Sequence, residues 1–148
     1  MPLPQLTEES VVIGAKAEDW RAAVREAGAA LARSGATLPV YAEEMVRMID
    51  EHGPYVVIAP GLALAHARPG PAVLANGLAV VTLATPVNFG HPHNDPVSVI
   101  LGLAVADAES HLASVAELAN IFNDEGAIPA LAAARSVEEV QKIMGGQL

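Results

Sequence analysis

The sequence predicts one α/β domain, residues 1–148, in which helices cover both faces of a mostly buried β-sheet. Three apolar stretches, 55–58, 78–83 and 97–103, show little alternation between polar and apolar residues. Strands buried on both faces have this pattern, whereas a half-exposed sheet alternates. Segments with the period of amphipathic helices lie before and after these stretches. With 148 residues, 52% of them hydrophobic, the chain can form one core without disulfides or a structural metal.

The N-terminal third is expected to contain one strand and two helices. A short apolar run over 11–15 suits a strand, although its length alone does not distinguish a strand from a buried helix. Over 19–33 apolar residues recur at helical spacing, with acidic residues at the positive end and a Ser-Gly pair as the stop signal. Pro39 suits the first turn of a second helix, whose apolar stripe begins at Tyr41 and which ends at Gly53.

The central third is expected to supply most of the sheet. The stretch 55–58 suits a buried strand, which a Pro-Gly pair ends before extended or looped structure resumes at 62–65. The stretches 78–83 and 97–103 are strongly β-like in composition. Between them, 85–96 is rich in Pro, Asn, Gly and Asp and is expected to form a long loop.

Helices are expected to complete the chain. From residue 110 to Phe122, apolar residues recur at helical spacing, with acidic residues and a serine at the N-terminal end. A short helix is expected over 128–135. The tetrapeptide Ser136-Val137-Glu138-Glu139 has the pattern of a capping box and predicts a last helix through Met144, which a Gly-Gly pair ends.

The charge balance argues against several classes of partner. Eight Lys and Arg residues stand against 17 Asp and Glu, giving a formal net charge of −9, and no run of basic residues occurs. Nucleic acids and anionic membrane surfaces require clustered cations. The N-terminus lacks the features of a signal peptide, and no apolar stretch approaches the roughly 18 residues of a membrane span. We therefore expect a cytoplasmic protein that binds no nucleic acid and does not insert into a membrane.

Several catalytic devices are missing from the sequence. Zero cysteines exclude a thiol nucleophile and Cys-ligated zinc. No phosphate-binding P-loop, dinucleotide-binding glycine turn or serine nucleophile elbow occurs. The remaining candidates are five histidines, four of which fall between residues 66 and 111.

His66 follows a strand-like run, just before a turn rich in Pro and Gly. A polar residue at the rim of the core is the simple interpretation. However, Arg68 lies two residues on, so in extended structure both side chains project from one face. A neutral imidazole beside a guanidinium is a plausible acceptor for a phosphoryl group.

The other histidines are ambiguous. His91 and His93 form an H-x-H pair near Asp95, a spacing found in metal sites, in a segment whose composition also suits a surface turn or the rim of an active site. His111 stands where a predicted strand passes into a helix, a common position for ligands in α/β sheets. His52, at a helix end, is expected to be incidental.

Four segments around these histidines match a known family in order and with compatible gaps. Together they resemble the EIIA domains of the bacterial sugar phosphotransferase system (PTS), in the ascorbate-type branch of the mannitol/fructose superfamily. The segments are GPYVVIAPGLALAHARP at 53–69, PVNFGH at 86–91, NDPV at 94–97 and ESHL at 109–112. The resemblance implies one mixed β-sheet flanked by helices on both faces, in agreement with the predicted elements.

The resemblance also implies a site. His66 corresponds to the histidine that carries the phosphoryl group, and His111 to the histidine beside it. His111 is expected to hydrogen-bond the phosphoryl oxygens, Arg68 to balance their charge, and amides near Ser110 to add donors. Two departures lie close by: Ala65 stands where the family usually has Pro, and Ala108 where it often has Asn. Neither removes a reactive group.

The implied activity is that of a phosphotransferase without cofactor, metal or nucleotide. A phosphoryl group passes from the carrier HPr to His66 and then to an EIIB component, serving a membrane EIIC that selects the carbohydrate, with ascorbate expected from the branch. One alternative is a regulatory EIIA-like phosphoprotein that signals to a target. The other is a metal-dependent hydrolase using His91, His93 and Asp95.

Overall fold

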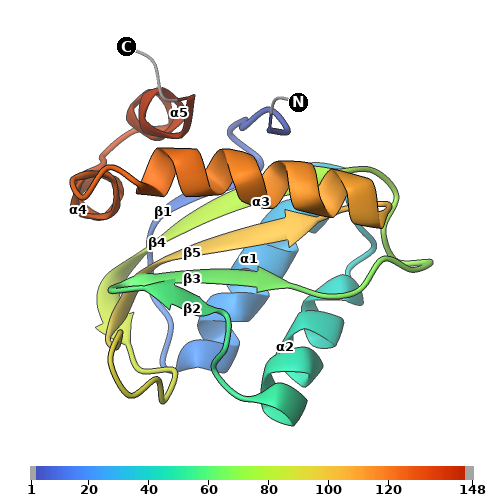
Figure 1. Ribbon diagram of the computed structural model, residues 1–148, viewed down its shortest axis with the longest axis horizontal. Helices are drawn as coiled ribbons and strands as arrows, with labels where there is room; N and C mark the ends of the chain where they lie inside the picture. Colours follow the sequence, from blue (N-terminus) through green and yellow to red (C-terminus); the bar gives the residue numbers. More distant parts are fainter. Residues whose placement is uncertain (1–2, 146–148) are drawn as a thin grey trace.

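The computed structural model of the chain describes residues 3–145, which form a mixed five-stranded sheet between two layers of helices (Figure 1). The strands span Val11–Ala15 (β1), Val57–Ala59 (β2), Leu62–His66 (β3), Gly77–Val87 (β4) and Val97–Ala104 (β5). Their order in the sheet is β1-β4-β5-β3-β2. The pairs β1–β4 and β3–β5 are parallel, and the pairs β4–β5 and β2–β3 are antiparallel. The predicted mixed sheet is confirmed.

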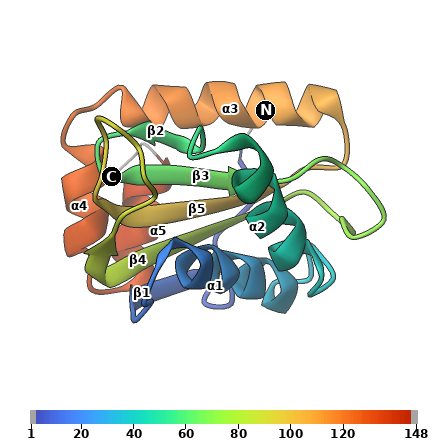
Figure 2. The same cartoon turned by 90° about the horizontal axis from the view of Figure 1, so that it is seen from below.

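Helices cover both faces of this sheet, as the sequence predicts. They span Trp20–Arg33 (α1), Tyr41–His52 (α2), Ala108–Phe122 (α3), Ala127–Ala133 (α4) and Val137–Gly145 (α5). In Figure 1, α1 and α2 lie below the sheet and α3, α4 and α5 lie above it; Figure 2 views the molecule from the side of α1 and α2. Within residues 3–145, no helix combines the length and the hydropathy needed to cross a bilayer.

The core is divided by the sheet into two apolar layers. On β3, Ala63 and Ala65 belong to the layer under α1 and α2, while Leu62 and Leu64 belong to the layer under α3, α4 and α5. Successive strand residues point to opposite faces, so both faces of β3 are apolar. This explains why the central stretches lack alternation. The small residues on the α1 side also allow that helix to approach closely, since a Cβ on Gly102 would lie 3.2 Å from that of Ala27.

Two predicted boundaries in the sheet are wrong in detail, and a third stretch, which the sequence left open, is now defined. The strand expected at 55–58 is the short edge strand Val57–Ala59, because the chain is still turning after Pro54. The stretch left open at 62–65 is a regular strand that continues to His66. The loop expected at 85–96 is shorter, because β4 extends to Val87, which pairs with Val97 beyond an irregularity in the ladder.

The starts of α1 and α5 follow the predicted capping signals, whereas α2 begins two residues after Pro39, which was expected in its first turn. Asp19 caps α1, its carboxylate accepting a hydrogen bond of 2.9 Å from the Ala22 amide. At α5 the Ser136 hydroxyl accepts from the Glu139 amide at 3.2 Å, as the capping box predicts. The Glu139 carboxylate accepts a hydrogen bond from the amide of Arg135, whereas in a capping box it would accept from that of Ser136.

The crossing of α1 and α2 depends on one glycine. A Cβ built on Gly28 would lie 2.3 Å from the Cβ and 2.7 Å from the Cα of Ala42. Real side chains do not approach so closely, and the contact includes backbone, so a larger residue would push the two helices apart. Ala42 follows Tyr41, the first residue of α2, and the crossing therefore fixes where that tyrosine enters the core.

We expect Gly28→Ala to destabilise the protein by about 1–3 kcal/mol, the usual cost of overpacking. At an exposed position inside a helix, replacing Gly by Ala usually stabilises the protein by about 1 kcal/mol. Gly145→Ala is the control, because no described residue lies within 4 Å of its added Cβ. As the last residue of α5, Gly145 should gain less than a glycine in a helix interior, and a change of less than about 0.5 kcal/mol is expected there. The free energy of unfolding in urea measures both, and a Gly28→Ala protein as stable as the wild type would contradict the prediction.

Candidate functional site

The fold brings the predicted site residues together at one edge of the sheet. His66 ends β3 and His111 lies in the first turn of α3, which follows β5. A hollow of about 270 Å³ lies here, lined by Met48, His66, Ala67, Arg68, Pro69, Ala108 and His111.

The surroundings of His66 favour a neutral ring with one defined tautomer. Its Nδ1 lies 3.1 Å from the carbonyl oxygen of Leu64. A carbonyl can only accept, so Nδ1 carries the proton and Nε2 carries the lone pair. Burial lowers the pKa of His66 below its usual value of 6.5, the Leu64 carbonyl partly opposes this, and the nearby His111 lowers the pKa further. An imidazole of this kind is a nucleophile at neutral pH.

His111 is the closest ring partner of the His66 imidazole across the hollow. The two ring centroids are 5.5 Å apart, and the ring planes are inclined by 47°. The start of α3 fixes this arrangement, because Asp107 caps the helix with a 2.7 Å hydrogen bond from the Ser110 amide. Hydrogen bonds from Ser110 also lower the pKa of the Asp107 carboxyl. The amide of Ser110, expected to be a free donor, is therefore already used by the cap.

Arg68 lines the same hollow without a carboxylate partner. Among the described residues, the ion pairs within 4 Å join Arg21 to Asp50, Arg25 to Glu43, and His52 to Glu51. A second hollow, of about 440 Å³, shares Arg68 and its neighbours with the first. The guanidinium is thus available to an anionic group in either hollow.

Tyr55 is a site residue that the sequence reasoning missed. Its ring packs edge-on against His66, with centroids 5.9 Å apart and planes at 89°, and on the other side against His52. Burial raises the pKa of the Tyr55 hydroxyl, and the charge of Arg68 opposes that effect. The sequence reasoning placed Tyr55 in a buried strand, whereas the Gly-Pro pair before it could have indicated a turn.

The loop that carries His91 and His93 is held together by its own polar side chains. The Asp95 carboxylate accepts hydrogen bonds from the amides of Phe89, Gly90 and His91 at 2.7 to 3.1 Å. Nδ1 of His91 accepts hydrogen bonds from the amides of His93 and Asn94. These groups, proposed as metal ligands in the alternative hypothesis, therefore have a structural use. Among residues 3–145 no group of three His, Asp or Glu side chains is placed to hold a metal ion.

This loop lies at the opposite end of β3 from His66. The Gly61 amide, just before β3, donates to the Asn94 carbonyl at 3.0 Å. His66 ends the strand, about 16 Å from Gly61 at the usual rise per residue. His91 and His93 therefore do not border the hollow of His66, which decides a point that the sequence left open.

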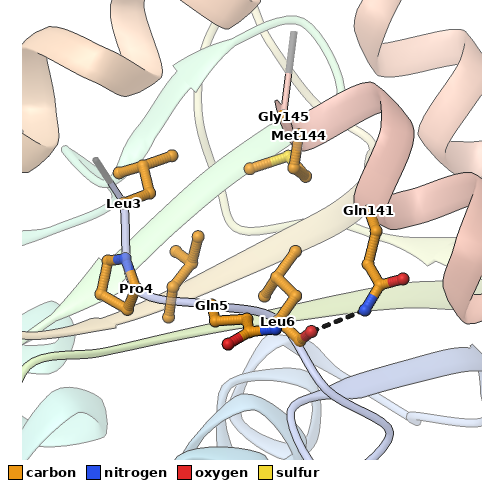
Figure 3. Close-up of a pocket in the computed structure, with 8 residues that line it drawn as sticks. Leu3, Pro4, Gln5, Leu6, Gln141, Met144 and Gly145 are labelled. Carbon is orange, nitrogen blue, oxygen red and sulfur yellow. Dashed lines mark hydrogen bonds between the residues drawn. The ribbon is translucent and has the colours of Figure 1, made fainter. Parts of the chain in front are cut away.

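A third hollow, of about 340 Å³, lies between the N-terminal segment and α5 (Figure 3). Its lining residues are Leu3, Pro4, Gln5, Leu6, Leu78, Gln141, Met144 and Gly145. Gln141 donates from Nε2 to the carbonyl of Leu6 at 2.7 Å, which ties α5 to this segment. Among the described residues that line it, none has a titratable side chain.

The fold and the site together define a class of protein: an α/β protein with a partly buried histidine whose lowered pKa favours the neutral ring, flanked by a second imidazole and by a guanidinium that has no ion pair among the described residues. Such a set suits transfer of an anionic group through a covalent histidine intermediate. Residues 4–145 match the family model for the phosphoenolpyruvate-dependent sugar phosphotransferase system, EIIA 2. The chain belongs to this family.

Individual relatives agree with this assignment. The chain is 37% identical over 133 residues to the ascorbate-specific PTS system EIIA component of Shigella boydii, covering 89% of this chain and 86% of that protein. It is also similar to the complex of enzyme IIAMTL and phosphorylated enzyme IIBMTL from Escherichia coli, with a TM-score of 0.85, 27% identity and coverage of 98% and 100%. For the crystal structure of IIA mannitol from Escherichia coli, the TM-score is 0.82 and the sequence identity is 27%, with coverage of 95% of this chain and 99% of that chain.

We expect the pKa of His66 to lie below 6.5 and to rise in His111→Gln without reaching 6.5. The substitution removes a neighbouring charge, but burial, the larger cause of the shift, remains. Titration of the ring protons by NMR measures this, with His93→Gln, at the far end of β3, as the control that leaves the pKa unchanged. A wild-type pKa at or above 6.5, or no rise in His111→Gln, would contradict the prediction.

Proposed function

We propose that this chain is the phosphocarrier of an ascorbate-type PTS and that His66 is its phosphoryl acceptor. The observation that carries the proposal is the state of His66, a largely buried imidazole whose Nδ1 is held by the Leu64 carbonyl. Its Nε2 keeps the lone pair, in a hollow that His111 and Arg68 also line. No cofactor, metal or nucleotide takes part in the proposed reaction.

In the transfer step, the Nε2 lone pair of His66 attacks the phosphorus of the donor's phosphohistidine. A new P–N bond forms as the donor's P–N bond breaks, and the electron pair of that bond returns to the donor imidazole. The His66 ring gains positive charge while its proton stays on Nδ1, which donates a hydrogen bond to the Leu64 carbonyl. That carbonyl is a fixed dipole with its negative end toward the charge, so it stabilises the transition state without reorganising.

The phosphoryl group brings negative charge into the hollow. His111, 5.5 Å away between ring centroids, is placed to donate a hydrogen bond to a phosphoryl oxygen. Arg68 is placed to balance the remaining charge. Phosphoryl transfer needs in-line positioning and charge neutralisation more than covalent help, which this small set of groups can supply.

The partners in this proposal are HPr as the donor and an EIIB component as the acceptor, with a membrane EIIC served indirectly. The Escherichia coli complex of enzyme IIAMTL with phosphorylated enzyme IIBMTL supports an EIIB partner. The name of the Shigella boydii relative supports ascorbate as the substrate of the system. Residues 1–148 would act as one EIIA domain, in the cytoplasm, where phosphoenolpyruvate is available to the system.

Incubation with Enzyme I, HPr and phosphoenolpyruvate, followed by mass spectrometry of the modified peptide, tests the reaction and the residue together. We expect one phosphoryl group on His66, no labelling of His66→Gln, and normal labelling of the control His93→Gln. Labelling of another residue would overturn the assignment of His66. Adding an ascorbate-type EIIB should discharge the label, and a label that EIIB does not remove would favour the regulatory alternative.

His111→Ala should slow transfer from phospho-HPr by about a hundredfold, the usual effect of losing one donor to a developing negative charge. Arg68→Gln should slow it only about tenfold, because the side chain is exposed and its charge is screened. Rapid-quench kinetics at two salt concentrations measures both, and the effect of Arg68 should shrink at high salt. An Arg68 effect that is independent of salt would contradict a role through charge alone.

A further inference from the structure

We propose that Tyr41 is a positioning residue for phosphoryl transfer, although it does not line the hollow around His66. The inference rests on the proposed function of His66. The observation behind it is that the Tyr41 hydroxyl bridges the ends of β3 and β5 at the site. Tyr41 comes from α2, which lies on the opposite face of the sheet from α3.

The bridge consists of three short contacts to backbone groups. Tyr41 is fully buried, and its hydroxyl oxygen accepts a hydrogen bond of 3.0 Å from the amide of Ala67, the residue directly after His66. The hydroxyl donates a hydrogen bond to the carbonyl oxygen of Leu103, with 2.8 Å between the two oxygen atoms, and the carbonyl oxygen of Ala67 lies at 3.3 Å. The hydroxyl thus both accepts and donates.

The bridge lies directly beyond the end of the β3–β5 ladder, next to His66. His66 and Leu103 form the last residue pair of the β3–β5 ladder. Beyond that pair the Ala67 amide and the Leu103 carbonyl are linked through the Tyr41 hydroxyl. Two hydrogen bonds in series hold the strand ends together where the ladder stops. The chain can therefore turn away after Ala67 while His66 stays fixed.

Several features keep the hydroxyl in its bridging form. The pKa of Tyr41 is raised to about 12, mainly by burial, so the hydroxyl keeps its proton throughout the physiological range. The close crossing at Gly28 and Ala42 sets the position of α2 next to the tyrosine. Because the ring is fully buried, water has no access from which to replace a lost hydroxyl.

Removing the hydroxyl would leave the Ala67 amide and the Leu103 carbonyl without this partner in a buried place. The chain after His66 would have to move to restore those hydrogen bonds, and it carries Arg68. A misplacement of about 1 Å in a reacting group can cost roughly a hundredfold in rate. The loss should appear in the transfer step and not in binding of the donor.

The test compares Tyr41→Phe with Met45→Leu, a conservative change at another fully buried residue of the same helix. Wild-type protein is first shown to be labelled on His66, which checks the proposed function separately. At saturating phospho-HPr we expect Tyr41→Phe to transfer about 10- to 100-fold more slowly, with little change in KM, and Met45→Leu to keep the wild-type rate. The free energy of unfolding of both variants identifies a merely structural effect.

A wild-type rate in Tyr41→Phe, or an equal loss in Met45→Leu, would overturn the inference. If Tyr41→Phe does not fold, amide hydrogen exchange in the wild type decides, because the Ala67 amide should be protected and fast exchange would overturn the bridge. If wild-type protein is not labelled on His66, the proposed function fails by itself. Exchange at Ala67 in Tyr41→Phe then still reports on the bridge.

Discussion

The parallel pairing of β3 with β5 is the constraint on which the site depends. Five residues of β3 pair with β5, from Leu62 with Val99 to His66 with Leu103. Parallel strands end at the same edge of a sheet, so His66 reaches the edge at which β5 passes into α3. His111 then meets His66 although the two are far apart in the sequence. A shift of one residue in this register would turn the imidazole to the other face.

The electrostatics of the site combine a His66 ring that favours the neutral form with a nearby guanidinium. Burial disfavours the charged form of His66 more strongly than the Leu64 carbonyl favours it, so the pKa falls. Arg68 lines the same hollow, and among the described residues it has no ion pair within 4 Å. In the proposed reaction the neutral ring would supply the lone pair, and the guanidinium would balance the charge of the incoming phosphoryl group.

The sequence predicted the elements of the fold well because their signals are local. Helical periodicity and capping residues such as Asp19 act within one turn, and both were confirmed. The edge strand β2 was misplaced because its bounds depend on pairing with β3. Tyr41 was correctly predicted to be buried, but its hydroxyl partners come from two distant strands, and no local pattern reports them. The position of the loop around His91 likewise depends on its contact with Gly61.

The departure at Ala65 illustrates how this chain orders the backbone around His66, the proposed phosphoryl acceptor. The resemblance implies that relatives place Pro before the active histidine, and Pro would fix the backbone dihedral φ there. In this chain Ala65 is fully buried in β3 and pairs with Gly102. The strand is therefore held by the ladder through His66 and by the Tyr41 hydroxyl immediately after it. Hydrogen bonds before and after His66 therefore fix the backbone in this chain, where a Pro at position 65 would fix it through its own ring.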